Sequence, residues 1–427
     1  MPEKTVASTQ PFMVMAKPVG SRCNMQCTYC YYTATQLPKD NEKQLCMSDE
    51  TLERFIMQYI DGNTNSPLYF VWHGGEPAIA GIDFFKRAIM IQKKYLPEGM
   101  SCKNNLQTNG LLLDDEWCAF LAKNDFDVGL SIDGTQLLHD HYRKDLGGNG
   151  THARVAATVD RLQSFGIKPD LLCTVNSETV KNPLAVYRAL RSFGTGWIQF
   201  IPIVRRENGS ITMDSVTGEG YGNFLCAVFD EWVLNDLGKV DVQIFSETAR
   251  VWAGGSAVLC WMAPVCGRVL IVELDGSVYS CDHFVKPDFH LGDVGKQSLR
   301  ELVDSPFQLE FGNGKREKLT AQCRSCQWLS VCNGGCPKDR FELAEDGEYG
   351  ANYLCDGLKS FFSYAQPAIN LVTMLNRNRQ TPEAIMVDLR NRLKAIWKDI
   401  GRNDLCPCGS SKKAKHCCWD KAQMYSR

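Results

Sequence analysis

Short apolar runs alternate with amphipathic stretches of helical period from Pro11 to about Leu237. The six runs predicted as strands are FMVMAK (12–17), LYFVW (68–72), KNNLQ (103–107), DVGLS (127–131), PDLLCT (169–174) and WIQFI (197–201). The helices that follow them are predicted to begin near Ser48, Ile82, Asp114, Thr151, Asn182 and Gly222. This alternation favours βα units with right-handed crossovers. We therefore expect an α/β fold in which residues 11–240 form a partial (β/α)6 barrel, with its active site at the carboxyl ends of the strands.

The regular alternation ends beyond Asp241, where cysteines become frequent. Residues 241–376 are predicted to form a second unit whose fold depends on bound metal. Residues 377–400 are predicted to form a connecting helix with one apolar face. That face carries Ile385, Leu389, Leu393, Ile396, Trp397 and Ile400. A short cysteine-rich tail, residues 401–420, completes the predicted organisation.

Composition narrows the class of protein. The chain has 427 residues, 44% of them hydrophobic, which is enough for one large domain and smaller ones. A net charge of −2 gives no cationic surface for nucleic acid. The start, MPEKTVASTQ, lacks the pattern of a signal peptide, and no apolar run could span a membrane, so we expect a cytoplasmic protein. Its 20 cysteines are clustered, which favours metal ligation over disulfides.

The first cysteine cluster, Cys23, Cys27 and Cys30, directly follows the first predicted strand. Three thiolates can hold three irons of a [4Fe-4S] cluster and leave the fourth iron open. A structural zinc site, the alternative, needs a fourth ligand, and no nearby Cys or His supplies one. This CxxxCxxC resembles the signature of the radical S-adenosylmethionine (SAM) superfamily. The resemblance implies that SAM binds the open iron and is cleaved to a 5′-deoxyadenosyl radical.

Further motifs at strand ends extend the resemblance. Gly74-Gly75-Glu76-Pro77 is similar to the GGEP motif of the family, whose backbone meets the SAM amino group; by themselves the glycines indicate only a turn. Gln107-Thr108-Asn109-Gly110 and Ser131-Ile132-Asp133-Gly134 end the third and fourth strands. The resemblance implies SAM contacts for Ser131 and Arg143, although a solvated arginine is the simpler alternative for Arg143. Tyr32 and Val204 fall where relatives contact SAM.

Eight later cysteines are the number that two four-thiolate sites require. They are Cys260, Cys266, Cys281, Cys323, Cys326, Cys332, Cys336 and Cys355. Two zinc sites would use the same ligand types. The frame CRSCQWLSVCNGGCP closely resembles the SPASM extension of radical SAM peptide-modifying enzymes, which implies two auxiliary [4Fe-4S] clusters. By that match, the first would be held by Cys260, Cys266, Cys281 and Cys336, and the second by Cys323, Cys326, Cys332 and Cys355.

Asp282 directly follows Cys281, and this pair is similar to one in the anaerobic sulfatase-maturating enzymes. The resemblance covers roughly residues 11 to 375. In that family an Asp beside an auxiliary-cluster ligand is the proposed base, so the resemblance implies that role for Asp282. A surface Asp in a turn is the alternative.

The tail GRNDLCPCGSSKKAKHCCWD looks like a SEC-C motif, a short zinc-binding module. The resemblance implies Zn²⁺ held by Cys406, Cys408, Cys417 and Cys418, with His416 as a competing ligand if the frame slips by one. Four thiolates can fold a peptide too small for a core of its own.

These resemblances together imply oxygen-independent oxidation of a Cys or Ser side chain to Cα-formylglycine, with SAM and three [4Fe-4S] clusters. The expected partners are an unfolded or nascent sulfatase chain and a flavodoxin or ferredoxin that supplies electrons, and we expect a monomer. The alternatives are a radical SAM/SPASM enzyme that crosslinks another ribosomal peptide, and a zinc-stabilised interaction protein without catalysis. The sequence does not choose between Cys and Ser as the target.

Overall fold

The six predicted strands form the centre of one sheet in the computed structural model, which describes residues 10–32, 45–64, 66–406 and 412–416. These strands are parallel and lie side by side in chain order. Their bounds are β1 (Met13–Ala16), β2 (Leu68–Trp72), β3 (Cys102–Thr108), β4 (Phe126–Ser131), β5 (Asp170–Val175) and β6 (Trp197–Pro202). The predicted α/β fold with a parallel, curved sheet is confirmed.

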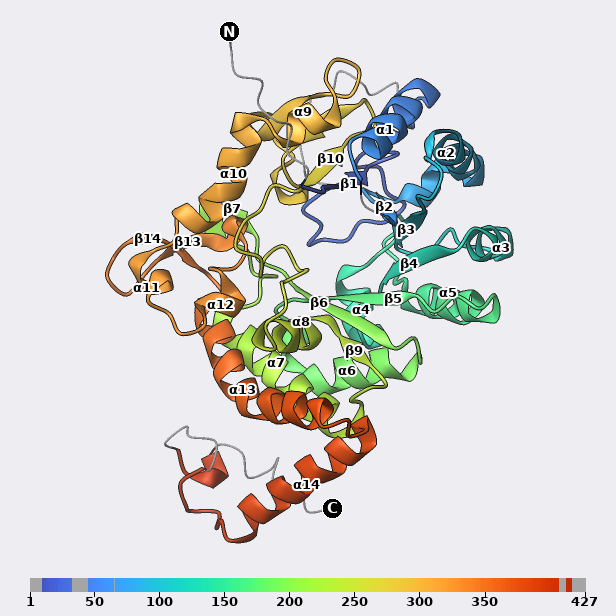
Figure 1. Cartoon of the computed structure of the whole chain (residues 1–427). Coiled ribbons are helices and arrows are strands. Elements are labelled where there is room, and N and C mark those ends of the chain that lie inside the picture. The colour runs from blue at the N-terminus through green and yellow to red at the C-terminus, as the bar shows by residue number, and fades with distance from the viewer. Residues whose placement is uncertain (1–9, 33–44, 65, 407–411, 417–427) are drawn as a thin grey trace.

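Helices cover the outer face of the sheet, as Figure 1 shows on its right-hand side. They are α1 (Asp49–Asp61), α2 (Ile82–Tyr95), α3 (Asp115–Lys123), α5 (His152–Ser164), α6 (Pro183–Ser192) and α7 (Gly218–Asn235). Side-chain caps fix several starts: Ser48 accepts from the backbone N–H of Thr51, and Asp114 from that of Trp117. Thr217 caps α7 in the same way, so this helix begins four residues before the predicted Gly222.

The sheet continues into the cysteine-rich half of the chain. β9 (Asp241–Val242) extends it beyond β6, and β10 (Val269–Val272), β11 (Ser277–Tyr279) and β12 (His290–Asp293) extend it beyond β1. β10 runs parallel to β1, with Ala16 opposite Val272. The sequence pattern did not predict this continuity; the boundary at residue 241 stays a prediction.

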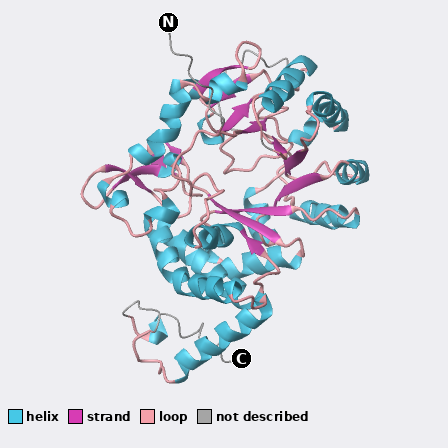
Figure 2. Cartoon of the chain, in the orientation of Figure 1, coloured by secondary structure: helices cyan, strands magenta, loops and turns pink. Residues whose placement is uncertain are grey.

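Helices and a hairpin follow on the left of Figure 1, where Figure 2 shows the hairpin strands in magenta. The remaining helices are α4 (Gln136–Tyr142), α8 (Gln243–Trp252), α9 (Leu299–Val303), α10 (Pro306–Glu317), α11 (Ala321–Arg324), α12 (Leu329–Cys332), α13 (Cys355–Arg377) and α14 (Pro382–Lys398). The remaining strands are β7 (Arg206–Glu207), β8 (Ser210–Ile211), β13 (Arg340–Leu343) and β14 (Tyr349–Asn352). Short 3₁₀ turns are η2 (Pro77–Ala80), η3 (Thr179–Lys181), η4 (Asp282–Phe284), η5 (Pro287–Phe289), η6 (Pro337–Asp339) and η7 (Ala414–His416).

The predicted connecting helix corresponds to α14, and its fully buried apolar residues lie in its first half, while Leu393 packs against the core from the second half. Ile385 and Leu389 are buried against α7 and α13, whereas Ile396 is half exposed. In Figure 1 the second half of α14 extends away from α7. Among the described residues, no helix is both long enough and apolar enough to cross a bilayer.

α7 and α13 pack through glycines at unusually short range. A Cβ added to Gly222 would lie 2.6 Å from the Cα of Gly357, and one added to Gly357 would lie 1.8 Å from the carbonyl oxygen of Gly218. Only glycine permits this approach, because every other residue would bring a Cβ into the facing backbone. The contact holds the first turn of α13, which begins at the predicted ligand Cys355, against the last helix of the barrel.

We expect Gly357→Ala to destabilise the protein by about 3 kcal/mol, because overpacked backbone must separate to admit the methyl group. Displacement of α13 would also move Cys355, so bound iron should fall. Thermal unfolding and iron analysis test both. Gly314→Ala in α10 is the matched control, since its Cβ would meet only the flexible Lys318 side chain at 3.5 Å or more. Equal effects of the two substitutions would contradict the packing argument.

Candidate active site

The first three cysteines lie in the loop that leaves β1, and all three are half-buried. The loop is tied to the segment after α4, because the N–H of Gln26 donates to the carbonyl of Lys144 at 2.8 Å. Burial raises the pKa of Cys23 to about 11 and that of Cys27 to about 12, and the neighbouring Cys30 adds to both shifts. Thiols in such a place ionise when a metal supplies positive charge, so this set fits a cationic cluster.

Among the residues that the structure describes, no group of three or more His, Cys, Asp or Glu side chains converges as a single metal ion requires. The thiols of the first set influence one another electrostatically from within one loop. Whether they are ligands stays a prediction from the sequence.

The predicted glycine pair presses against this loop. A Cβ on Gly75 would lie 2.0 Å from the carbonyl oxygen of Arg22, directly before Cys23. The N–H of Gly75 donates to Gly20 at 2.9 Å, and that of Glu76 donates to Arg22 at 2.8 Å. Gly74 has a φ of 123°, which favours glycine. The motif therefore fixes the approach of the cysteine loop to the end of β2.

The Glu76 carboxylate lies below this turn and is fully buried. Its Oε1 accepts from the N–H of Ala78 at 3.0 Å and the hydroxyl of Thr108 at 2.8 Å, and its Oε2 accepts from the N–H of Asn109 at 2.7 Å. Asn109 in turn donates to Asn24 at 2.7 Å, between the first two cysteines. The side chain of Glu76 thus joins the ends of β2 and β3.

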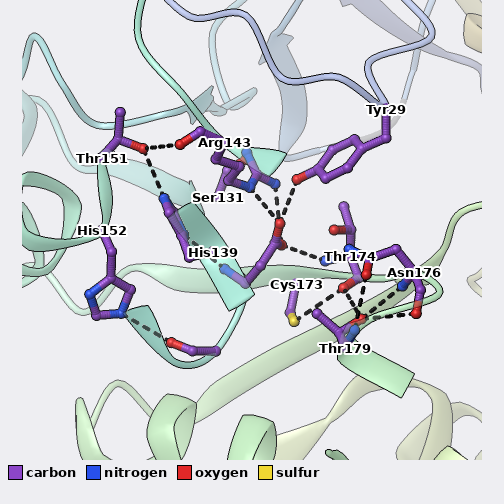
Figure 3. Close-up of polar contacts among 12 residues, drawn as sticks. Tyr29, Ser131, His139, Arg143, Thr151, His152, Cys173, Thr174, Asn176 and Thr179 are labelled. Atoms are coloured by element: carbon purple, nitrogen blue, oxygen red, sulfur yellow. Dashed lines mark hydrogen bonds and ion pairs between the residues drawn. The ribbon is translucent and has the colours of Figure 1, made fainter. Parts of the chain in front are cut away.

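Arg143 is buried, and a network of polar residues holds it in place (Figure 3). Its Nε donates to Asp133 Oδ2 at 2.8 Å, the hydroxyl of Tyr29 donates to the same oxygen at 2.5 Å, and the N–H of Thr174 donates to Oδ1 at 2.8 Å. The guanidinium lies 5.5 Å from the centroid of the Tyr29 ring. Asp133 thus holds the guanidinium beside the cysteine loop, so Arg143 is not a solvated loop arginine.

His139 supports this network from behind. The N–H of Asp133 donates to His139 Nδ1 at 3.2 Å, so Nε2 carries the proton toward Thr151 Oγ1 at 2.9 Å. The hydroxyl of Thr151 donates to the carbonyl of Arg143 at 3.0 Å. Burial lowers the pKa of His139 to about 3, so the ring is neutral. The ends of β4 and α4 are thereby locked together.

Of the other predicted SAM contacts, Ser131 and Val204 lie at strand ends and Tyr32 lies in the cysteine loop. Ser131 ends β4, and its Oγ is 3.4 Å from Gln107 Nε2. Val204 follows β6 and is half-buried. It packs against the apolar core that includes Phe200 and Phe224. Tyr32 is buried, and its hydroxyl donates to Glu273 at 2.6 Å.

Asp282 lies between two donors at the start of η4. Lys17 Nζ donates to its Oδ1, and the Tyr31 hydroxyl donates to its Oδ2. Burial opposes ionisation of Asp282, but Lys17, His73 and His283 together outweigh it and hold the pKa of this carboxyl well below its usual range. Burial, with Lys17, lowers the pKa of the nearby His73 to about 4. Asp282 is therefore an ionised carboxylate in a buried site, and not a surface Asp.

The first auxiliary set lies near two cations, the buried Lys315 and the half-buried Arg340. Cys281 and Cys336 influence each other electrostatically, and Cys260 acts on both. Cys266 is influenced by Cys260 and by two cations, Lys315 and Arg340, which lower its pKa against the effect of burial. Lys315 Nζ donates to the carbonyls of Cys260 and Trp261 at 2.8 and 2.7 Å. The cations suit a set of thiolates, since they offset its negative charge.

The second auxiliary set lines a single cavity. Its walls contain Cys323, Cys326, Cys332 and Cys355, together with apolar side chains that include Trp328 and Phe362. Burial and the neighbouring thiols raise the pKa of Cys332 to about 12. The sequence grouping thus agrees with the placement of these four side chains around one space.

The zinc set of the tail is only partly within the described residues. Cys406 is buried, and its N–H donates to the carbonyl of Lys412 at 2.7 Å. Cys408, Cys417 and Cys418 lie outside the described residues.

Four side chains of the site were not assigned a role from the sequence. Lys17 is the last residue of the first predicted strand, Tyr31 follows the third cysteine, and His73 follows β2. Asp133 belongs to the motif Ser131-Ile132-Asp133-Gly134. Its position at a strand end, beside a glycine, is the sequence signal that could have identified it as a site residue. The other three could not be identified from sequence because their partner, Asp282, is more than 200 residues away.

Comparison with protein families and known proteins gives three family matches and several full-length relatives. Residues 18–190 match the radical SAM superfamily, residues 255–327 an iron-sulfur cluster-binding domain called SPASM, and residues 402–420 the SEC-C motif. A serine-type anaerobic sulfatase-maturating enzyme of Bacteroides thetaiotaomicron is 41% identical over 90% of this chain and 96% of its own length. A cysteine-type enzyme of Clostridium perfringens is 32% identical over 84% of this chain and 97% of its own length.

Solved structures agree with these matches. The structure described as native anSMEcpe with bound AdoMet and Cp18Cys peptide has a TM-score of 0.77 and 31% identity, and the match covers 85% of this chain and 99% of that one. Streptococcus suis SuiB bound to its precursor peptide has a TM-score of 0.58 at 15% identity, which shows a shared fold alone. The predicted barrel, SPASM unit and SEC-C tail are therefore confirmed as family assignments.

We expect Asp133→Asn to weaken SAM binding at least tenfold, because the substitution leaves the buried Arg143 cation without its counter-charge, a loss of about 3 kcal/mol or more. The concentration of SAM that gives half-maximal 5′-deoxyadenosine production measures this. Asp115→Asn is the control: it removes a largely exposed ion pair with Arg161 and should change stability by less than about 1 kcal/mol. Unchanged SAM dependence in Asp133→Asn would contradict the positioning of Arg143 by Asp133.

Proposed function

Since this chain belongs to the radical SAM family of anaerobic sulfatase-maturating enzymes, we propose that it oxidises a Cys or Ser residue of a sulfatase precursor to Cα-formylglycine without oxygen. The observation that carries the proposal is the 41% identity to a serine-type maturase over 90% of the chain, together with the half-buried Asp282 carboxylate, which Lys17 holds directly after Cys281. A non-catalytic zinc protein is set aside, because the relatives that match this chain over 84% to 90% of its length are named as sulfatase-maturating enzymes.

The donor sets fit the groups that this chemistry needs. We propose that Cys23, Cys27 and Cys30 hold the SAM-binding [4Fe-4S] cluster, and that Arg143, Ser131, Tyr32, Val204 and the turn Gly74-Gly75-Glu76 surround SAM. When bound, this cluster would supply the electron for cleavage of SAM, and with it the radical chemistry that removes one hydrogen atom from Cβ of the target residue. The Asp133 contact matters here because it holds the Arg143 guanidinium beside Tyr29 of the cysteine loop.

Asp282 would complete the oxidation as the base. The target side chain must lose a hydrogen atom from Cβ, a proton from its thiol or hydroxyl, and one further electron to reach a C=S or C=O group. Loss of the Cβ hydrogen makes the remaining S–H or O–H proton much more acidic, so an ionised carboxylate of low basicity suffices to accept it. The thioaldehyde from Cys would then be hydrolysed to formylglycine and hydrogen sulfide, whereas Ser would give the aldehyde directly.

The two auxiliary sets would receive the electron that the target loses. We propose a [4Fe-4S] cluster at each set, because each gathers four cysteines, and all of them except Cys260 are half-buried. A flavodoxin or ferredoxin would return electrons for SAM cleavage. Clustered reduced cysteines suit the cytoplasm. We further propose that the protein is a monomer and that Zn²⁺ binds the tail, with Cys406 as its described ligand.

The function is tested with short peptides of the form Cys-x-Pro-x-Arg and Ser-x-Pro-x-Arg, incubated anaerobically with SAM and a reductant. Mass spectrometry should show formylglycine in at least one of them, with 5′-deoxyadenosine formed in equal amount. The comparison of the two peptides decides between a Cys and a Ser target. SAM cleavage without formylglycine in either would favour the alternative of a maturase for another ribosomal peptide.

Asp282→Asn should separate hydrogen abstraction from product formation. The variant is nearly isosteric and keeps Cys281, so iron content should survive, while loss of a positioned base typically lowers a rate by about 10² to 10⁴. Formylglycine should fall by that order while peptide-dependent 5′-deoxyadenosine continues. Asp275→Asn, an exposed acidic residue nearby, is the matched control. Wild-type formylglycine yields from Asp282→Asn would remove Asp282 from the mechanism.

A further inference from the structure

Three neighbouring strands carry an ionisable residue at the same level, directly after each strand ends. The register places Ala16 opposite both Val272 and Trp72, so the next residues, Lys17, Glu273 and His73, are also neighbours. Backbone hydrogen bonds continue to this level: Lys17 N–H donates to Val272 at 2.8 Å. Residues at the same register of adjacent parallel strands point to the same face of the sheet. Lys17 therefore has Glu273 beside it as well as Asp282 in front of it.

Lys17 is the ammonium for which these carboxyl groups compete. Its side chain is fully buried, its Nζ donates to Asp282, and Nζ lies 4.0 Å from the centroid of the Tyr32 ring. Asp282 and Glu273 would carry two negative charges against this one positive charge if both were ionised. Burying an unpaired charge is costly, so one of the two carboxyl groups should hold a proton.

Glu273 is the carboxyl group that is poorly paired. Its Oε1 accepts from the Tyr32 hydroxyl at 2.6 Å, but its Oε2 is buried and has no hydrogen-bond partner among the described residues. Burial raises the pKa of Glu273 to about 7. Asp275 and Asp282 raise it further, whereas Tyr32 and Lys17 oppose the shift. Glu273 therefore holds its proton below neutral pH, while Asp282 keeps Lys17.

We propose that Glu273 is a positioning residue for Asp282: as a neutral carboxyl group it leaves Lys17 bound to Asp282, and as a carboxylate it draws Lys17 away. The inference rests on the proposed function, in which Asp282 accepts the proton of the target residue. Glu273 touches neither target nor SAM in this role. It acts through Lys17, whose hydrogen bond fixes one oxygen of Asp282 and leaves the other to face the Tyr31 hydroxyl or a substrate.

The direction of the pH effect follows from the raised pKa of Glu273. Below about pH 7 the side chain is neutral and the Lys17–Asp282 pair is intact; above it the ionised Glu273 competes for the ammonium. Coupling of SAM cleavage to product formation should therefore weaken as pH rises. Glu273→Gln keeps the shape and an acceptor for Tyr32 but cannot ionise, so it should stay coupled at high pH.

The experiment measures formylglycine formed per 5′-deoxyadenosine, in the complete holoenzyme, between about pH 6 and about pH 9. Because both products depend on SAM cleavage, this ratio does not change when pH alters the reductant or the rate of SAM cleavage. In the wild type it should fall about three- to tenfold across the range, and in Glu273→Gln it should remain constant. Asp115→Asn removes an equal charge from an exposed residue of α3 that does not act on Glu273, and it should keep the wild-type profile.

Two further measurements keep the inference testable if Glu273→Gln loses iron. Tyr32→Phe removes the hydrogen bond that lowers the pKa of Glu273, so the decline should move to higher pH. Infrared difference spectra should show a protonated carboxyl band that disappears as pH rises and is missing in Glu273→Gln. A wild-type ratio that falls in parallel with that of Glu273→Gln would overturn the inference. A wild type that forms no formylglycine at any pH would instead overturn the proposed function.

Discussion

The end of the barrel that carries the site is organised by the cost of burying carboxylates. Asp133, Asp282 and Glu76 all lie in or beside the site with little exposure, and each is satisfied differently. Asp133 takes an arginine and a tyrosine, Asp282 takes a lysine and a tyrosine, and Glu76 takes backbone and hydroxyl donors. Because a buried carboxylate without partners is unfavourable, each one specifies where its donors must lie. The placement of Arg143, Lys17 and the end of β3 follows from this requirement.

Much of the fold could be predicted from the sequence because its strands are compact apolar runs and several helices begin at good capping residues. β2, for example, was predicted with its observed bounds, and α1 begins after the cap Ser48. α4 was missed because seven residues are too few to show a period. β10 was not predicted. Its run VLIV is typical of a buried strand, but it has only four residues and lies in a cysteine-rich stretch where the regular alternation of strands and helices has ended.

The site divides in the same way. Cysteines can be recognised as candidate ligands from their spacing in the sequence, and the four thiols of the second auxiliary set line one cavity. The side chains that hold and orient these groups cannot be recognised from local sequence patterns. Lys17 acquires a role only when β1 lies beside β10 and brings it to Glu273 and Asp282, and no local pattern in the sequence encodes that contact. A lysine at a strand end is otherwise typical of an exposed position.

The pairing of β1 with β10 also has a consequence for how the chain folds. Met13 is opposite Val269, so a strand made at the start of synthesis gains this neighbour only after about 250 further residues have been added. Contacts of such sequence separation form slowly, because a long loop must first be closed. Until then β1 presents an open edge, which invites pairing with other chains. The first cysteine loop is thus completed late, and a nascent chain that stops before β10 is expected to aggregate and not to mature.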